Sequence, residues 1–167
     1  MPSIFVASVQ DSLHALNRIV SVLRGRNFRI DSVMMARSEQ PDMARLTVVV
    51  DESQARPQRV ASCLDKLEEV WSIREAHPSL VVRRQAALVK VSDSDGTRAW
   101  IASLPASGAV RVAERSGGAA ILELFGTPEE VDRAIASLPA DSIIESAKLG
   151  PFVMLHGAQP TTEATRT

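Results

Sequence analysis

The sequence has little cysteine, few aromatic residues and almost no net charge, and each shortage excludes a class of protein. A single cysteine, Cys63, cannot form an intramolecular disulfide, so the chain is not a disulfide-rich secreted domain and suits a reducing compartment. Tyrosine is absent and aromatic residues make up only 4% of the chain, which disfavours a nucleic-acid groove built on base stacking. The formal net charge of −1 supplies no overall field toward nucleic acid or an anionic membrane.

Long apolar runs are also missing. No stretch approaches the length that spans a bilayer, so no membrane segment is expected. The first residues, Met1–Phe5, lack the positive flank and apolar run of a signal peptide. We therefore expect a cytoplasmic protein.

Catalytic and metal-binding constellations are scarce. His14, His77 and His156 lie far apart, each without a companion at metal-ligand spacing. The stretch 93–96, Asp-Ser-Asp-Gly, is similar to the start of a calcium loop but has no glutamate at the far end, so a turn is the better interpretation. Cys63 lies on the apolar side of an expected helix and is interpreted as a packing residue. We expect no metal site and no catalytic activity of the chain's own.

The first half alternates strand and helix patterns. Asp11 and Ser12 offer helix-capping side chains, Gly25 is expected to end the first helix, and Pro57 suits the first turn of the second. The order is β-α-β-β-α-β, typical of a ferredoxin-like unit, with strands expected at 4–9, 28–36, 43–50 and 71–76 and helices from 13 and from 57.

The second half repeats this pattern. Strands are expected at 86–91, 109–113, 119–125 and 143–147, with helices at 97–104 and after the capping residue Thr127. A shift of 71 residues superposes Pro57 on Pro128 and Val60 on Val131. The predicted fold class is therefore α+β with two ferredoxin-like units at 1–77 and 85–157, a linker at 78–84 and a disordered tail at 158–167.

Strands 28–36 and 43–50 carry apolar residues on both sides. A lone ferredoxin-like unit has helices on only one face of its sheet, so the second apolar face needs a cover. That cover is either the second domain or a partner chain, and we favour an obligate oligomer.

The turn between the first strand and the first helix is the candidate binding site. Free backbone amides and the positive end of the helix dipole suit the carboxylate of an amino acid at residues 11–16, with the second strand, 28–36, of a second copy as a wall. The candidate effector-binding residues are Asp11, Ser12, Leu13, His14, Ala15, Leu16, Arg29 and Ile30.

Several segments together resemble the small regulatory subunit of acetolactate synthase, a family that carries an ACT (amino-acid-sensing) domain. The matching stretches lie at 15–19, 29–33, 43–48, 64–68, 84 and 88–91, over nearly the whole of 4–157. The resemblance implies that 1–77 is the ACT domain and 85–157 the C-terminal small-subunit domain. It also implies a homodimer through the ACT domain and a catalytic large subunit as partner. Thiamine diphosphate, magnesium and FAD would belong to that partner, and valine or another branched-chain amino acid would act as effector.

The departures from the family pattern fall on the effector turn. Asp11 stands where the family has asparagine, Leu13 where it has proline or serine, and His14 where it has glycine, while Arg29 replaces a second asparagine. An imidazole fills space that glycine leaves open for a ligand near the backbone. One hypothesis is that Asp11 and Arg29 pair across the dimer interface and partly replace the effector. The alternative is that both are independent exposed charges.

Two other functions are alternatives to regulation of acetolactate synthase. The first is a stand-alone ACT module that regulates a different enzyme or transcription factor, and the second is an enzyme in its own right. The segment 84–91, which resembles the family, disfavours the first, and the lack of an acid-base or nucleophile cluster disfavours the second.

Overall fold

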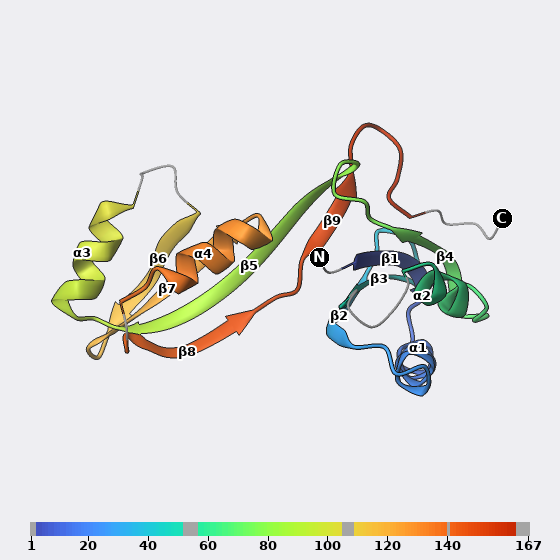
Figure 1. Cartoon of the computed structure of the whole chain (residues 1–167), viewed down its shortest axis with the longest axis horizontal. Coiled ribbons are helices and arrows are strands. Elements are labelled where there is room, and N and C mark those ends of the chain that lie inside the picture. The colour runs from blue at the N-terminus through green and yellow to red at the C-terminus, as the bar shows by residue number, and fades with distance from the viewer. Residues whose placement is uncertain (1–2, 52–56, 105–108, 140, 163–167) are drawn as a thin grey trace. The chain divides into compact units, whose positions relative to one another are not determined.

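A computed structural model describes residues 3–51, 57–104, 109–139 and 141–162. The chain divides into two compact units (Figure 1). The N-terminal unit comprises Met1–Val82 and Phe152–Thr167, and the C-terminal unit comprises Arg83–Pro151. This division differs from the expected one because the chain returns to the N-terminal unit at Phe152.

The N-terminal unit has the expected β-α-β-β-α-β order. Its sheet order is β2-β3-β1-β4, with all neighbours antiparallel. The elements are β1 Ser3–Gln10, α1 Leu13–Gly25, β2 Ile30–Arg37, β3 Met43–Val50, α2 Pro57–Leu64 and β4 Val70–Glu75. The α+β, ferredoxin-like prediction is confirmed for this unit.

The main core of the N-terminal unit lies between the helices and one sheet face. Ile19 and Leu23 of α1 are buried against strand residues such as Phe5 and Val48, as the helical spacing predicts. The prediction for the end of α1 is wrong in detail. Gly25 is the last helical residue, and the left-handed backbone conformation falls at Asn27, with φ of 55°. Asparagine tolerates this conformation better than most side chains, so glycine is not needed there.

The C-terminal unit repeats the same order and topology, with sheet order β6-β7-β5-β8. Both expected helix starts from the internal repeat are confirmed, since Pro57 and Pro128 each open a helix and Val60 and Val131 are both buried. The elements are β5 Val81–Ser92, α3 Asp95–Ser103, β6 Val110–Ser116, β7 Ala119–Gly126, α4 Pro128–Ala136 and β8 Ile143–Lys148. Strand β5 begins inside the expected linker.

A ninth strand, β9 Phe152–Leu155, pairs with β5 (Figure 1). No sequence pattern predicted it. Its residue Val153 is 2% exposed and packs in a second core cluster of the N-terminal unit, which consists of Ile4, Val6, Val49, Ala76, Val81 and Val153. None of these residues comes from a helix, so we call this side of the N-terminal sheet its helix-free face. The cover over this cluster is therefore the chain's own returning segment.

The end of the chain is only partly as expected. Thr161, inside the expected disordered tail, is 7% exposed, while 163–167 lie outside the described residues. Cys63 is half-buried rather than part of the core. Within the described ranges, no helix is long and apolar enough to cross a membrane.

Candidate effector-binding turn

The turn from β1 into α1 is built by local capping. Ser12 is the N-cap of α1, and its hydroxyl accepts a hydrogen bond from the Ala15 amide at 3.1 Å. The Asp11 amide donates to the Asp42 carbonyl at 2.9 Å, which ties the turn to the loop between β2 and β3. Asp42 has a φ of 60°, and this left-handed conformation turns the loop at the point where its carbonyl accepts the bond. Ser12 and Asp42 thus hold the turn in place from both sides.

Two amides at the start of α1 remain as donors. Within the described part of the chain, no acceptor reaches the amides of Leu13 and His14. Leu13 is 85% exposed, so its side chain does not contribute to the core. Free amides and the positive end of the helix dipole favour an anion such as a carboxylate. The turn therefore has the polarity that the sequence predicts.

The charged residues Asp11 and Arg29 each have a partner within the chain. Arg37, the last residue of β2, donates from Nε to Asp11 Oδ2 at 2.9 Å. Arg29 Nε lies 3.7 Å from Asp51 Oδ2, a loose ion pair. Arg37 and Asp51 were not predicted as part of this region, because their contacts depend on strand pairing between β2 and β3.

His14 and Arg18 share a buried carboxylate. Glu69 has a side chain only 10% exposed, and its Oε1 lies 3.2 Å from His14 Nε2 and 3.5 Å from Arg18 Nε. Its other oxygen, Oε2, is buried without a hydrogen-bond partner among the described residues. The His14 imidazole is thus held against Glu69.

The remaining predicted site residues serve mainly as core. Ala15 is fully buried, and Leu16 and Ile30 pack against the helix-side core. Within the predicted segment 11–16, the side chains of Asp11, Leu13 and His14 are exposed, whereas Ala15 is buried and Leu16 is partly buried. Leu16 at one helical turn from Ser12 faces inward because α1 buries one side only.

A groove of about 640 Å³ lies beside the turn. It is lined by Gln10, Gln40, Pro41, Asp42, Met43, Glu68 and Trp71. Trp71 is the second residue of β4 and is 41% exposed, whereas the preceding Val70 is buried. Sequence reasoning missed this groove, because it joins the ends of β1, β3 and β4 and no single segment signals it.

The same turn occurs a second time in the C-terminal unit. Ser94 caps α3 by accepting from the Thr97 amide at 3.2 Å, as Ser12 caps α1. The Asp93 amide donates to the Gly118 carbonyl at 2.8 Å, and Gly118 has a φ of 77°. Asp93 Oδ1 lies 3.4 Å from Arg115 Nε, near the end of β6. The predicted turn chemistry at 93–96 is therefore correct, with glycine at the position that corresponds to His14.

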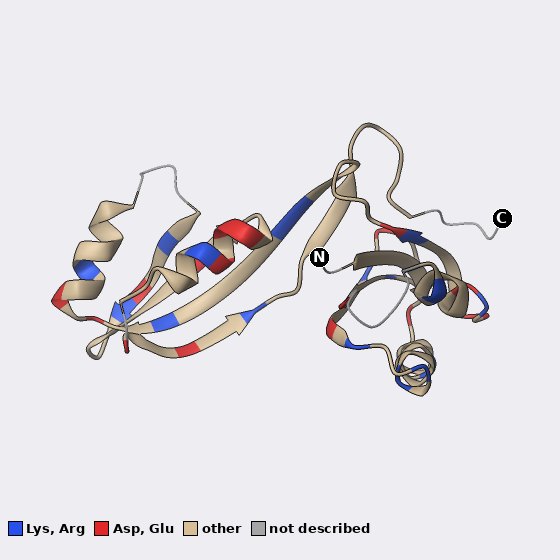
Figure 2. Cartoon of the chain, viewed as in Figure 1, with Lys and Arg blue, Asp and Glu red and all other residues tan. Residues whose placement is uncertain are grey.

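Charged side chains of both signs are distributed over both units. Figure 2 shows acidic and basic positions interspersed along both units. A side-chain hydrogen bond with Asp93 raises the pKa of Arg98 on α3. Among the described residues, no group of three histidine, cysteine, aspartate or glutamate side chains is placed to hold a metal ion.

Comparison with known proteins identifies relatives over nearly the full length. The sequence matches no protein-family model. The acetolactate synthase small subunit of Mycolicibacterium smegmatis is 31% identical over 149 residues, covering 89% of this chain and 88% of the relative. A probable acetolactate synthase small subunit of Methanothermobacter thermautotrophicus is 27% identical over 157 residues, covering 93% and 94%.

A solved structure supports the fold. The crystal structure of the acetolactate synthase small subunit from Thermotoga maritima superposes with a TM-score of 0.83 at 24% identity, covering 95% of this chain and 99% of that chain. The ferredoxin-like fold and the sequence relationship agree. The chain belongs to the acetolactate synthase small-subunit family.

Proposed function

We propose that this chain is a regulatory subunit that activates a thiamine-diphosphate-dependent acetolactate synthase catalytic subunit and carries an altered site for a branched-chain amino acid. The observation that carries this proposal is the relationship to small subunits along about nine-tenths of the chain. The free amides of Leu13 and His14 at the start of α1 support a carboxylate-binding role for the turn.

The geometry suggests how the site is altered. In place of glycine, the His14 imidazole stands on the first turn of α1 and is directed to Glu69 at 3.2 Å. An effector that approaches the helix amides meets this side chain and the Asp11 carboxylate, which Arg37 holds at 2.9 Å. Steric bulk and added negative charge both disfavour ordinary valine binding, so we expect weak or retuned effector control.

The partner supplies the chemistry in this proposal. Thiamine diphosphate, magnesium and FAD would be bound by the large catalytic subunit, whereas the residues of this chain bind the effector and contact that subunit. The proposed assembly is a homodimer through the N-terminal unit, whose edge strand β2 pairs only with β3 in the sheet formed by the described residues.

Pairing of Asp11 with Arg29 of a second copy remains a prediction. In such a dimer, Asp11 would share its carboxylate between Arg29 and Arg37, and Arg29 would turn away from Asp51. These exposed pairs are weak, so exchange between partners costs little.

Reconstitution tests the proposal. The purified catalytic subunit from the same organism is assayed for acetolactate formation with and without this chain, and valine, leucine and isoleucine are then titrated. We expect clear activation and an inhibition constant for valine well above that of a valine-sensitive relative. Failure to co-purify with the catalytic subunit or to activate it would favour the stand-alone ACT module.

A pair of variants locates the effector site. The double variant His14→Gly and Arg29→Asn should increase valine sensitivity, because it restores the backbone access and neutral side chain of the family pattern. His77→Gly is the matched control, since the His77 side chain is exposed on the same unit and its Nδ1 lies 2.8 Å from the nearby Ser79 hydroxyl. Equal valine sensitivity in both variants would contradict the assignment of this turn.

A further inference from the structure

The returning segment Phe152–Thr162 is integrated into the N-terminal unit. Val153 is buried with Ile4, Val6 and Val49, while the neighbouring Met154 is 66% exposed. The segment is also fixed internally, because the Leu155 amide donates to Thr161 Oγ1 at 2.9 Å. It therefore behaves as part of the helix-free face and not as a loose end.

Arg45 of β3 connects this segment to the sheet. Its Nη2 donates to the Val153 carbonyl. The side chain is half-buried, and this burial lowers the pKa of Arg45, while the nearby Glu39 carboxylate acts in the opposite direction. A guanidinium with several donors can satisfy a backbone carbonyl and interact with a carboxylate at once. Arg45 thus stands between the returning segment and the loop between β2 and β3.

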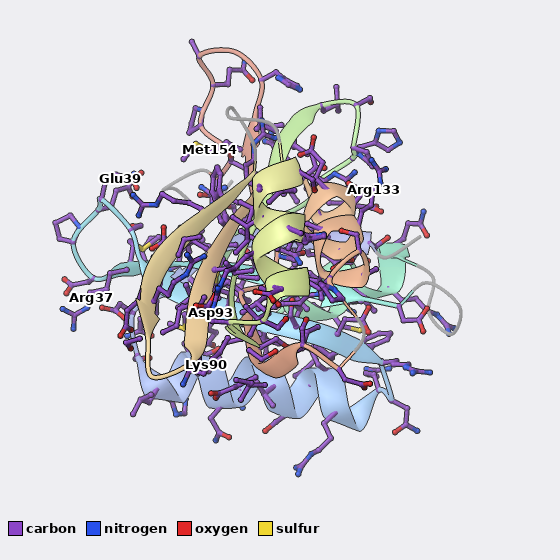
Figure 3. All side chains as sticks on the ribbon, turned by 90° about the vertical axis from the view of Figure 1, so that its left-hand side faces the viewer. Arg37, Glu39, Lys90, Asp93, Arg133 and Met154 are labelled. Carbon is purple, nitrogen blue, oxygen red and sulfur yellow. The ribbon has the colours of Figure 1, made fainter. Side chains whose placement is uncertain are left out.

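The loop between β2 and β3, residues 38–42, lies beside the segment and is hydrogen-bonded to the candidate effector turn. A small polar cavity is lined by Thr162 together with Ser38, Glu39 and Gln40 of this loop. Figure 3 shows the side chains of Arg37 and Glu39 around the same loop. On the other side of the loop, the Asp42 carbonyl accepts a hydrogen bond from the Asp11 amide. Arg37, which precedes the loop, binds the Asp11 carboxylate.

We propose that Arg45 is a positioning residue: it fastens the returning segment onto the loop 38–42, and the loop in turn sets the position of the effector turn at Asp11. This proposal rests on the proposed function in one respect, the effector-binding role of the turn at Asp11. Contacts between the segment, Arg45 and the loop are independent of whether valine is the ligand. Arg45 then influences the effector turn indirectly, through the loop and the backbone of Asp42.

Trp71 provides a direct spectroscopic readout. It lines the groove formed by Gln40, Asp42 and Met43, so its emission reports the position of this loop. The chain has two tryptophans, and the change Trp100→Phe in the C-terminal unit leaves Trp71 as the only one. In this background, Arg45→Met should shift the Trp71 emission and increase its quenching by iodide at least about twofold, and Arg45→Lys should partly restore both.

The matched control is Arg59→Met, which removes an exposed arginine of α2 in the same unit. If Arg45→Met does not fold, Thr161→Val removes the Leu155 contact more gently and should shift Trp71 in the same direction. An unchanged Trp71 signal in a folded Arg45→Met protein, equal to that of Arg59→Met, would overturn the proposal.

Valine titration separates this proposal from the proposed function. If the unmodified chain responds to valine, Arg45→Met should raise the half-saturating concentration about tenfold, a typical coupling between linked sites. If the unmodified chain binds no amino acid, the effector part of the proposed function fails, while the Trp71 measurement still decides the role of Arg45. A shift of Trp71 with unchanged valine affinity would refute the coupling of the loop to the effector turn.

Discussion

The two units share topology, helix placement and even a capped aspartate-serine turn, but they differ in what covers the helix-free face of each sheet. In the N-terminal unit, Val6 at the centre of that face is fully buried by β9 and its neighbours. In the C-terminal unit, Leu88 and Phe125 on strands β5 and β7 are 51% and 54% exposed. The two repeats are thus more alike in sequence pattern than in the surroundings of their helix-free sheet faces.

This difference has a simple physical cause. A ferredoxin-like sheet has helices on one face only, so an apolar second face needs extra chain. The N-terminal face carries an apolar cluster that includes Ile4, Val6 and Val49, and this cluster receives β9. The C-terminal face mixes Leu88 with ion pairs such as Arg111 with Glu123 at 2.6 Å, which remain hydrated without a cover.

The strongest test of the comparison is to place a charge under the returning segment. Val153→Asp should destabilise the N-terminal unit by about 3 kcal/mol or more, because the carboxylate would be buried among aliphatic side chains. Met154→Asp, one residue further and exposed, should change stability by less than about 0.5 kcal/mol. Urea unfolding in the Trp100→Phe background, followed by Trp71 fluorescence, measures both. Equal losses would show that β9 does not cover the face.

A matched pair of truncations compares the two faces directly. Val6→Ala should cost about 2 kcal/mol, since it removes buried methyl groups and leaves a cavity. Leu88→Ala, at an exposed position of β5, should cost less than about 0.5 kcal/mol. Circular dichroism during urea unfolding measures both values. A large loss for Leu88→Ala would mean that this face is buried in solution, for example by a partner.

The helix cap of α4 offers a smaller effect that is specific to the C-terminal unit. The Thr127 hydroxyl accepts from the Glu130 amide at 3.2 Å, and the Thr127 amide donates to Glu130 Oε2 at 2.8 Å. Thr127→Val should cost about 1 kcal/mol, as for other N-cap losses. Thermal unfolding at neutral pH measures the loss.

The same cap predicts a pH dependence. The backbone hydrogen bond from Thr127 lowers the pKa of Glu130 below its ordinary value. Its stabilisation is therefore present above the unfolded-state pKa and is lost as pH falls through the lowered folded-state pKa. We expect Glu130→Gln to flatten the acid limb of the stability profile of the C-terminal unit, and an unchanged profile would contradict the cap.

The smallest effect concerns the two repeated turns. Asp11→Asn removes an ion pair with Arg37, whose side chain is 87% exposed, and should cost less than about 0.5 kcal/mol. Asp93→Asn should cost more, because the Asp93 side chain is only 11% exposed and contacts both Arg98 and Arg115. Chemical unfolding of both variants tests this order. The reverse order would mean that Asp11 has stronger partners than Arg37, such as a second copy.

Much of the fold was predictable because the relevant signals are local. Hydrophobic spacing predicted the two units, and Thr127 with Pro128 predicted the start of α4. The candidate effector turn was likewise predictable as a turn with free amides, because capping by Ser12 is a contact three residues along the chain. Its ion pairs were not predictable, since Glu69 and Arg37 reach the turn only through sheet pairing and helix packing.

By itself, the sequence determined the element types of the two repeats, the internal repeat and the family, because these depend on periodicity, caps and matches along the chain. Tertiary structure alone decided that β9 returns to cover Ile4, Val6 and Val49, that Arg45 meets the Val153 carbonyl, and that His14 shares Glu69 with Arg18. The physical reason is distance along the chain: Arg45 and Val153 lie 108 residues apart, and no local pattern encodes a contact formed by folding two distant segments onto one sheet.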